Sequence, residues 1–271
     1  MSNTDKFSEF VRLHQDKELF VMPNPWDIGS TRIFSQLGFK ALATTSGGMA
    51  YSIGKRDGEV TKDEAIKHCI EIAAATALPV SADLENGFGD SPEAVADTIT
   101  AIGATGVAGG SIEDYTGNPK SAIYDTSLAV ERIQAANEAR KKLDNDFVLT
   151  ARCEKFVWGE NDVDAVIERF QAFESAGADV LFAPGMNDLK DIKLLLQSVS
   201  IPINVLMSSP NLPYGLDELR ELGVRRVSIG SSIAQIVYGK TITAIKELAE
   251  SGTFNFVHDA MDYEELESWY K

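Results

Sequence analysis

Two carboxylates stand two residues apart at the end of a short apolar run. Asp83 and Glu85 close the run that begins after Pro79, and a Gly-x-Gly turn follows at 87–89. On a β-strand, residues i and i+2 point to the same face, so these side chains lie side by side. Like charges held this close need a cation between them or a raised pKa. A hard divalent ion such as Mg2+ would suit them, whereas a solvated pair of acids at a strand end is the other interpretation.

Further polar groups follow other strand-like runs: Trp26-Asp27, Ser46-Gly47-Gly48, Glu113-Asp114 and Arg152-Cys153-Glu154. An arginine among carboxylates suits a metal-bound, oxygen-rich substrate whose own carboxylate pairs with Arg152. The Ser-Gly-Gly segment can offer backbone N–H groups to the same carboxylate, because glycine lets the main chain approach a ligand closely. Simpler roles stay open: a plug for Trp26, a turn for Ser-Gly-Gly, a helix cap for Glu113-Asp114, and a structural ion pair for Arg152.

The elements that must position these groups repeat one unit, a short strand followed by a loop and a helix. Strands are predicted at 19–22, 41–45, 80–84, 106–112, 147–151, 180–183, 203–206 and 226–229. Helices are predicted at 4–15, 28–37, 62–75, 92–102, 126–142, 162–176, 189–198, 215–222 and 232–249. The alternation predicts an α/β fold, a (β/α)8 TIM barrel with an N-terminal helix and a C-terminal helical extension. In such barrels chemistry sits at the carboxyl ends of the strands.

The domain organisation follows from the same pattern. A chain of 271 residues fits one barrel. We expect residues 1–252 to form the barrel with its N-terminal helix and residues 253–271 to form the extension. The extension is rich in aromatic residues, so we expect it to pack on the barrel or on a neighbouring subunit.

Composition excludes several classes of function. The formal net charge is −16, from 25 basic and 41 acidic residues, which disfavours binding to nucleic acid or an anionic membrane. Cys69 and Cys153 form no C-x-x-C pair and stand apart from the three histidines, which makes a disulfide framework or a zinc site unexpected. The chain shows no signal-peptide pattern and no apolar run of about 18 residues. We therefore expect a cytoplasmic protein.

The joint set of motifs resembles the isocitrate lyase and phosphoenolpyruvate mutase superfamily. The matching segments are Pro-Asn-Pro-Trp-Asp at 23–27, Thr-Thr-Ser-Gly-Gly at 44–48, Lys-Arg-Asp-Gly-Glu at 55–59, Ala-Asp-Leu-Glu-Asn-Gly-Phe-Gly at 82–89, Ser-Ile-Glu-Asp at 111–114 and Thr-Ala-Arg at 150–152. The resemblance covers about 21–239. It implies a Mg2+-dependent barrel, with Mn2+ as a substitute, that acts on small α-keto or 2-hydroxy acids through an enolate of a pyruvate-like fragment.

The resemblance also implies roles for individual residues. Asp83 would bind the metal directly, while the metal's water molecules would be held by Asp57, Glu85 and Glu113. The substrate carboxylate would be bound by Thr44, Ser46, Gly47, Gly48 and Arg152, and the catalytic groups would be Arg152 and Glu113. The role of Asp57 rests on the resemblance alone, because a charged loop is otherwise expected to be solvated. The resemblance also implies a homo-oligomer, either a dimer or a tetramer.

The chain departs from known branches in two places. Segment 114–124 lacks the cysteine and histidine of the isocitrate lyase loop. Its similarity to the gating loop of the mutases is weak and is limited to Asn118, Lys120 and Ser121. The family's common Arg-Thr-Asp is replaced by Arg152-Cys153-Glu154. The general acid or base is left open among Tyr115, Tyr124, Lys120 and Glu154.

These features lead us to expect a Mg2+-dependent lyase, or ligase in reverse, that acts on a C–C bond of a small anionic carboxylic acid. The alternative within the same fold is P–C bond chemistry of the phosphoenolpyruvate mutase or phosphonopyruvate hydrolase type. The third hypothesis is a barrel that binds carboxylates without catalysing a reaction.

Overall fold

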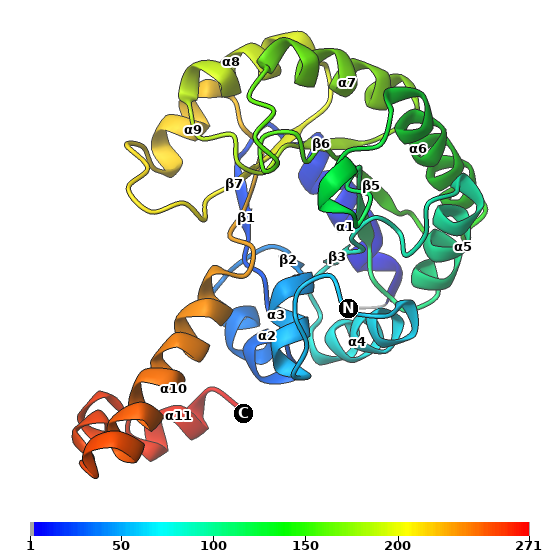
Figure 1. The fold of residues 1–271 in the computed structure, drawn as a ribbon. Coiled ribbons are helices and arrows are strands. Elements are labelled where there is room, and N and C mark those ends of the chain that lie inside the picture. The colour runs from blue at the N-terminus through cyan, green and yellow to red at the C-terminus, as the bar shows by residue number, and fades with distance from the viewer. Residues whose placement is uncertain (1–2, 271) are drawn as a thin grey trace.

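Eight parallel strands form the inner wall of the protein (Figure 1). The computed structural model describes residues 3–270. The strands are β1 (Phe20–Met22), β2 (Leu42–Ala43), β3 (Val80–Asp83), β4 (Gly109–Glu113), β5 (Val148–Arg152), β6 (Val180–Phe182), β7 (Ile203–Leu206) and β8 (Arg226–Ser228). They pair in the order β1-β8-β7-β6-β5-β4-β3-β2. The circle is nearly closed, because β1 and β2 are joined by a 3.1 Å hydrogen bond from Ala43 N to Pro23 O. The predicted (β/α)8 barrel is confirmed.

Helices surround this wall. They are α1 (Asn3–Gln15), α2 (Ile28–Ser35), α3 (Ser46–Ser52), α4 (Lys62–Ala75), α5 (Pro92–Gly103), α6 (Thr126–Arg140), α7 (Val163–Ser175), α8 (Leu189–Ser198), α9 (Leu216–Leu222), α10 (Ser232–Ser251) and α11 (Tyr263–Ser268). Two 3-10 turns are also present, η1 (Pro119–Ser121) and η2 (Asn255–Asp259). The N-terminal helix and the C-terminal helices of the prediction are therefore both present.

The helix boundaries follow from capping residues. The side chain of Thr61 accepts a hydrogen bond from Glu64 N and the Glu64 side chain accepts one from Thr61 N, so this capping box starts α4. At the start of α5 the side chain of Ser91 accepts a hydrogen bond from Ala94 N, and a proline stands in the first turn. Gly223 ends α9 with a φ of 93°, a conformation that glycine adopts without strain. These caps place each strand end and its following loop in a defined position.

Two predicted boundaries differ from the structure. The strand expected at 41–45 is limited to Leu42–Ala43, because Thr45 leaves the sheet to cap α3. The Ser-Gly-Gly segment, for which a turn was one expectation, forms the first turn of that helix. The remaining strands lie within a few residues of their predicted positions.

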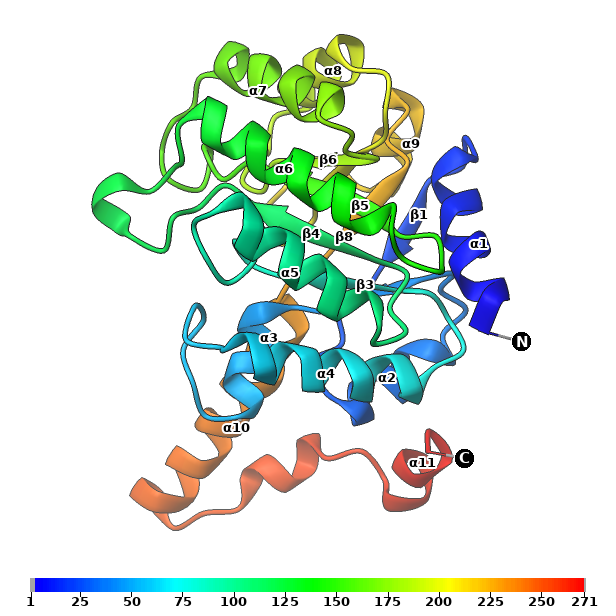
Figure 2. The same cartoon turned by 90° about the vertical axis from the view of Figure 1, so that its right-hand side faces the viewer.

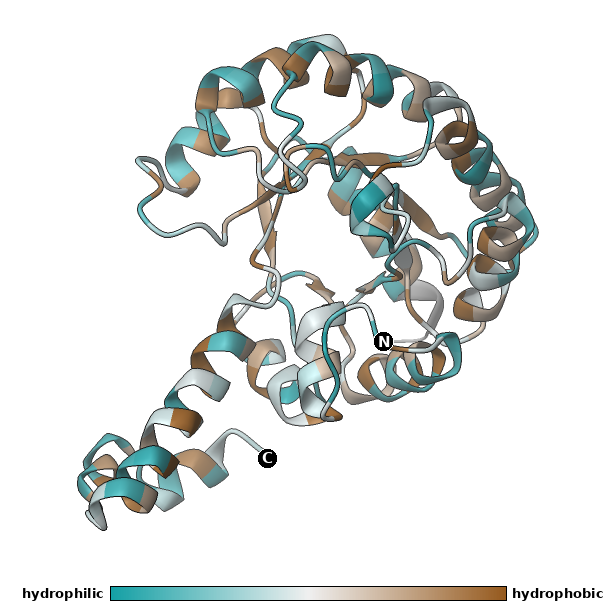
Figure 3. Ribbon diagram, in the orientation of Figure 1, coloured by the Kyte–Doolittle hydropathy of each residue, from teal (hydrophilic) through white to brown (hydrophobic). Residues whose placement is uncertain are grey.

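The apolar core has two parts. A large cluster fills the space between the strands and the outer helices and includes Leu84, Ile99, Phe170 and Phe173. A second cluster closes the amino-terminal end of the barrel, where Phe10 and Leu13 of α1 pack against strand residues. Brown, apolar colouring along the strands in Figure 3 agrees with this distribution. The helix α1 is thus a plug that leaves the carboxyl end of the barrel for the site.

The last part of the chain leaves the barrel. Figures 1 and 2 show α10 extending away from the wall and the tail returning beneath α2. Residues 253–271, for which an extension was expected, follow the end of α10. Exposed apolar side chains follow this helix and the tail, and they include Ile236 (58% exposed), Ile242 (57%), Ile245 (56%) and Phe254 (63%). The tail contacts α2 through a hydrogen bond from Gln36 Nε2 to Trp269 O.

Across the described part of the chain, no helix combines the length and the apolar character needed to cross a membrane.

Candidate active site

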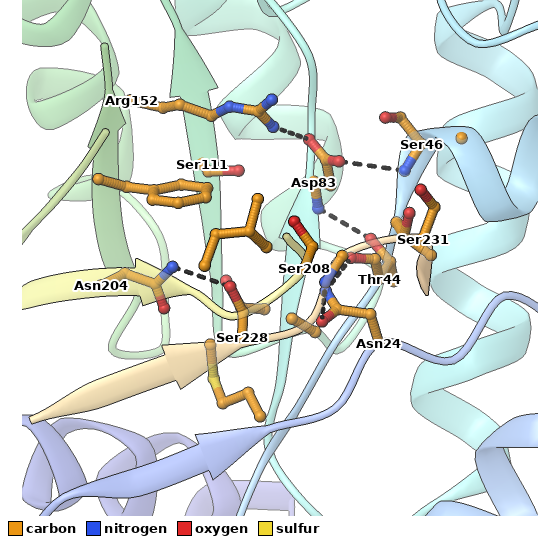
Figure 4. Close-up of a pocket in the computed structure, with 18 of the residues that line it drawn as sticks. Asn24, Thr44, Ser46, Asp83, Ser111, Arg152, Asn204, Ser208, Ser228 and Ser231 are labelled. Atoms are coloured by element: carbon orange, nitrogen blue, oxygen red, sulfur yellow. Dashed lines mark hydrogen bonds and ion pairs between the residues drawn. The ribbon is translucent and has the colours of Figure 1, made fainter. Parts of the chain in front are cut away.

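A cavity of about 360 Å³ opens at the carboxyl ends of the strands. Side chains from all parts of the barrel wall line it, and many of them are small and polar (Figure 4). The predicted site residues among them are Thr44, Ser46, Gly47, Asp57, Asp83 and Arg152. Glu85, Glu113 and Gly48 lie just outside the lining. The cavity therefore has the dimensions of a site for a small acid.

Asp83 is held from two sides at the centre of the site. Ser46 N donates a 3.0 Å hydrogen bond to Asp83 Oδ2, and Arg152 Nη1 lies 3.6 Å from Asp83 Oδ1 (Figure 4). The backbone of Asp83 is fixed as well, because its N–H donates to Thr44 Oγ1 at 2.8 Å. Thr44 is thus a support for Asp83. The carboxylate has little freedom to move away from the cavity.

Arg152 places a positive charge beside Asp83. Its Nη1 lies 3.3 Å from Glu113 Oε2, its Nε donates to Glu154, and its guanidinium stands 5.3 Å from the centre of the Phe182 ring. Burial alone would lower the pKa of Arg152, but the carboxylates of Glu154, Glu113 and Asp83 raise it well above its usual range. The positive charge is therefore permanent and is shared among three acids.

The surrounding carboxylates are poorly solvated. Burial, with the nearby charges of Asp83 and Asp57, raises the pKa of Glu85 to about 7. Burial is also the main cause that raises the pKa of Asp57 and of Glu113. Glu85 Oε1 is buried and has no hydrogen-bond partner among the described residues. The φ of Glu85 is 48°, which is uncommon for a residue other than glycine.

These observations fit a hard cation bound partly through water. A metal site without its ion is expected to have buried carboxylate oxygens that lack hydrogen-bond partners. It is also expected to have several acids with raised pKa values, because the metal would supply the counter-charge. Within the described residues, no three carboxylate, imidazole or thiolate groups come close enough together to enclose a metal by themselves. Mg2+ usually keeps several waters, so the residues that would hold it are Asp83 directly and Asp57, Glu85 and Glu113 through water.

The backbone N–H groups of the Ser-Gly-Gly segment differ in their hydrogen-bond partners. Ser46 N–H is already bound to Asp83, and Gly48 N–H donates to Thr45 Oγ1 at 3.3 Å. The N–H of Gly47 is the remaining backbone donor of the three, because the first turn of a helix leaves its N–H groups without helical partners. A Cβ at Gly47 would lie 3.1 Å from Asp57 Oδ2, so a side chain at this position would crowd the Asp57 carboxylate.

Two buried arginines support the loops of the site. Arg132 donates to the carbonyl oxygens of Asn86, Gly89 and Asp90, which fixes the loop that follows Glu85. Arg169 pairs with Asp114 at 2.8 Å, and Asp114 Oδ1 also accepts a 2.7 Å hydrogen bond from Glu154 N. Asp114 is therefore a structural ion-pair partner that joins the ends of β4 and β5.

The four candidates for a general acid or base lie in different places. Tyr124 donates to Asp90 behind the β3–α5 loop, and Lys120 is exposed on η1. Tyr115 stacks on Trp158, with 4.7 Å between ring centres. Glu154 is buried against Arg152. None of the four lines the cavity, and Glu154 is the one that is in contact with a lining residue through an ion pair.

Several lining residues escaped the sequence interpretation. The clearest are Asn24, Ser111, Asn204, Arg226 and Ser228, which face the barrel interior. Asn24 Oδ1 accepts hydrogen bonds from the backbone N–H groups of Ile229 and Gly230 and so fixes the loop after β8. For the residues other than Asn24, which follows β1, the sequence signal is a polar residue inside a strand that is otherwise buried.

Comparison with known proteins identifies the family of the chain. Residues 10–249 match the phosphoenolpyruvate phosphomutase family. The chain belongs to this family, within the phosphoenolpyruvate mutase and isocitrate lyase superfamily. Among curated members, 2-methylisocitrate lyase of Escherichia coli K12 is 32% identical over 234 residues, which cover 83% of this chain and 78% of that protein. Oxaloacetate decarboxylase of Chromohalobacter salexigens is 27% identical over 91% of this chain and 86% of that protein.

Solved structures of family members share the fold. A provisionally assigned lyase/mutase from Burkholderia cenocepacia J2315 is 43% identical and superposes with a TM-score of 0.94, over 99% of this chain and 96% of that chain. A 2,3-dimethylmalate lyase is 25% identical with a TM-score of 0.84, over 99% of this chain and 94% of that one. The resemblance to the superfamily, inferred from the motifs, is therefore confirmed. The relatives named above as lyases and a decarboxylase are enzymes.

Proposed function

We propose that this member of the phosphoenolpyruvate phosphomutase family is a Mg2+-dependent lyase, or a ligase in the reverse direction. It would break or make a C–C bond in a small α-keto or 2-hydroxy carboxylic acid, through an enolate of a pyruvate-like fragment. The observation that carries the proposal is the convergence of Asp83, Arg152 and the first turn of α3 on one small cavity. The names of the two curated relatives, a 2-methylisocitrate lyase and an oxaloacetate decarboxylase, support C–C chemistry.

Each residue has a defined part in this proposal. Mg2+, when bound beside Asp83, would supply Lewis-acid stabilisation of negative charge on a substrate oxygen. Ser46 N–H and the Thr44 hydroxyl keep Asp83 in position, as their hydrogen bonds show. Gly47 N–H and Arg152 bind the substrate carboxylate, since both are cavity donors. Glu113 would be the second catalytic group: burial raises its pKa, and its Oε2 lies 3.3 Å from Arg152 Nη1, which holds the carboxyl group beside the arginine that binds the substrate.

Chemistry at a P–C bond is the second candidate, because the matching family carries the name of a phosphomutase. A phosphoryl group needs a cation that closes on it. Lys120, which the sequence offered for that task, is exposed on η1 and does not line the cavity. This placement favours the lyase.

The remaining parts of the proposal concern the surroundings of the enzyme. Mn2+ should replace Mg2+, because both accept oxygen ligands. We propose a homo-oligomer, a dimer or tetramer, and a reducing cytoplasmic location, in keeping with the two free buried cysteines.

The decisive experiment follows pyruvate formation by NMR with Mg2+ present. The acids to compare are oxaloacetate, 2-methylmalate-type acids, isocitrate-type acids and phosphonopyruvate. Asp83→Asn should lower Mg2+ affinity by about 100-fold or more, because even supporting residues of metal sites are worth 10–100-fold. Asp97→Asn, at an exposed position of α5, is the matched control and should behave like the wild type.

Three outcomes separate the candidates. Pyruvate from a carbon acid, lost in Asp83→Asn, would establish the lyase. Turnover of phosphonopyruvate alone would replace it by P–C chemistry. Tight binding of oxalate without turnover of any of these acids would identify a carboxylate-binding barrel.

A further inference from the structure

The place where β1 and β2 meet, which we call the seam of the barrel, lacks a regular ladder of hydrogen bonds. These two strands stand at the ends of the pairing order. Within residues 3–270 a single backbone hydrogen bond joins them, from Ala43 N to Pro23 O. A parallel ladder would continue with a bond donated by the backbone N–H of residue 25, but this residue is proline and has no N–H. The backbone therefore cannot close the seam any further.

The side chain of Asn24 closes the seam instead. Asn24 stands between two prolines and is 6% exposed. Its Nδ2 donates to Thr44 O at 3.0 Å, shortly after the end of β2. Its Oδ1 accepts from Ile229 N at 3.0 Å and from Gly230 N at 2.9 Å, directly after β8. One buried carboxamide thus ties together the carboxyl ends of β1, β2 and β8.

The bond from Asn24 to Thr44 leads on to the proposed metal ligand. Thr44 N donates to Ser81 O at 2.9 Å, and Thr44 Oγ1 accepts from Asp83 N at 2.8 Å. Two polar groups of Thr44 are therefore bound to β3, while Asn24 holds its carbonyl oxygen (Figure 4). A shift of Thr44 would move the backbone of Asp83 with it. Because Mg2+ demands near-ideal octahedral geometry, a displaced ligand would weaken its binding.

The bonds from Asn24 to Ile229 and Gly230 fix a second part of the cavity wall. Gly230 has a φ of 56°, a left-handed conformation in which the chain turns from β8 toward α10. Asn24, Gly230 and Asp83 all line the cavity. The same carboxamide therefore determines how the segment after β8 lies relative to β2 and, through Thr44, relative to Asp83.

We propose that Asn24 is a positioning residue of the metal site: its carboxamide closes the seam and, through Thr44, holds Asp83 where Mg2+ binds. This inference rests on the proposed function, which makes Asp83 the direct metal ligand. A carboxamide suits the task, because its oxygen accepts two hydrogen bonds while its nitrogen donates one, and a carboxylate would lack the donor. Asn24 acts through Thr44 and is not itself a metal ligand.

The affinity for Mg2+, measured by titration calorimetry on the full chain, tests this role. Asn24→Ala removes all hydrogen bonds of the carboxamide and should weaken Mg2+ binding by about tenfold, the lower end of the effect of residues that support a metal ligand. Asn137→Ala is the matched control. Asn137 is also buried, and its Nδ2 donates to Ala176 O at 3.2 Å, but it lies on α6 and does not line the cavity. The control should lose stability and keep the affinity for Mg2+.

A double-mutant cycle with Thr44→Val tests the route through Thr44. This substitution removes the hydroxyl that accepts from Asp83 N and should weaken Mg2+ binding by about tenfold or more. If Asn24 acts through Thr44, the double variant should bind Mg2+ about as weakly as Thr44→Val alone, because residues in one hydrogen-bond network are not additive. Losses of affinity that multiply would mean that Asn24 acts independently of Thr44, and would overturn the proposed route.

Hydrogen exchange of the wild-type protein gives a test that does not depend on the folding of any variant. Coupling between two sites is reciprocal, so saturating Mg2+ should strengthen the hydrogen bonds of Asn24. Amide exchange at Ile229 and Gly230, which donate to Asn24, should therefore become slower with Mg2+. A peptide from α6 should exchange at the same rate with and without Mg2+.

The outcomes separate this inference from the proposed function. A wild type that binds no Mg2+ would contradict both. Equal affinities of the wild type and Asn24→Ala for Mg2+ would overturn the positioning role alone, because Asn24 would then only stabilise the fold. Exchange at 229–230 that does not respond to bound Mg2+, or that slows no more than exchange in α6, would also overturn it, even if Asn24→Ala fails to fold.

Discussion

The neutral state of His14 links a single residue to the stability of the whole protein. His14 Nδ1 lies 2.7 Å from Phe10 O and Nε2 faces Arg226, so the proton belongs on Nδ1 and Nε2 accepts from the guanidinium. Protonation of Nε2 would bring two positive charges together in a buried place. Burial of the imidazole, and after it the charge of Arg226, lowers the pKa of His14 to about 3, well below the usual value near 6.5.

The sign of the pH dependence follows directly. Between pH 6.5 and 3 the unfolded chain binds a proton at His14 that the folded protein excludes, so the free energy of unfolding decreases as the pH falls. His14→Gln removes this contribution. The stability difference between wild type and variant should shrink by roughly 3 kcal/mol from pH 7 to pH 4, as measured by urea unfolding. Carboxylates such as Glu85 titrate in both proteins and cancel, so an unchanged difference would disprove the assignment.

The sequence identified some site residues and missed others for a physical reason. Asp83 and Arg152 end strands, Glu85 lies in the turn directly after β3 and not on the strand as expected, and the carboxyl ends of parallel barrel strands meet in one place whatever the register. Arg226 lies inside a strand, where the direction of a side chain depends on how the barrel closes. Asp57 came only from the family resemblance, because its position depends on α3 and on the missing side chain of Gly47.

At the level of elements, α3 depends on close packing at Gly48. A Cβ there would lie 2.6 Å from Thr45 Cγ2 and 2.8 Å from Trp26 Cβ, two atoms held by the cap of α3 and by the core. Gly48→Ala should therefore lower the free energy of unfolding by about 1–3 kcal/mol, the usual effect of overpacking.

The matched control for this change is Gly239→Ala. Gly239 lies within α10 and has no atom within 4 Å of an added Cβ, so alanine should leave stability unchanged or raise it by up to about 1 kcal/mol. Thermal unfolding of the three proteins compares them directly. If both variants unfold at the wild-type temperature, the packing role of Gly48 is wrong.

The elements themselves were predictable because apolar runs and capping residues are local signals. The Thr61 and Ser91 caps stand in the sequence where α4 and α5 begin. The helix α3 was not predicted, since Ser46-Gly47-Gly48 has low helix propensity. Tertiary contacts with Asp83 and Trp26 stabilise it instead.

For the whole molecule, the exposed apolar surface of α10 and the tail predicts association with a partner chain. Ile242 and Ile245 are more than half exposed on α10, and Phe254 and Val257 continue this surface. Deleting residues 253–271 should lower the oligomeric state, because apolar surface of this kind marks an association site. Light scattering gives the mass. An unchanged mass would contradict the prediction.

A matched pair of substitutions separates the surface from the deletion itself. Ile245→Glu on α10 should weaken association, whereas Ile70→Glu, at a 50% exposed position of α4, should not. Equal effects of both substitutions would mean that added charge, and not the α10 surface, lowers the mass.

The contact between His14 and Arg226 also has a consequence for how the chain can fold while it is synthesised on the ribosome. His14 and Arg226 are 212 positions apart, and β1 pairs with β8. Until the segment 226–228 emerges, the edge of β1 is unpaired and α1 lacks the arginine that its histidine contacts. Contacts this distant in sequence slow folding, and an open strand edge invites association between nascent chains. The barrel wall therefore closes only after about five-sixths of the chain has been synthesised, and the cavity is completed in the same final step.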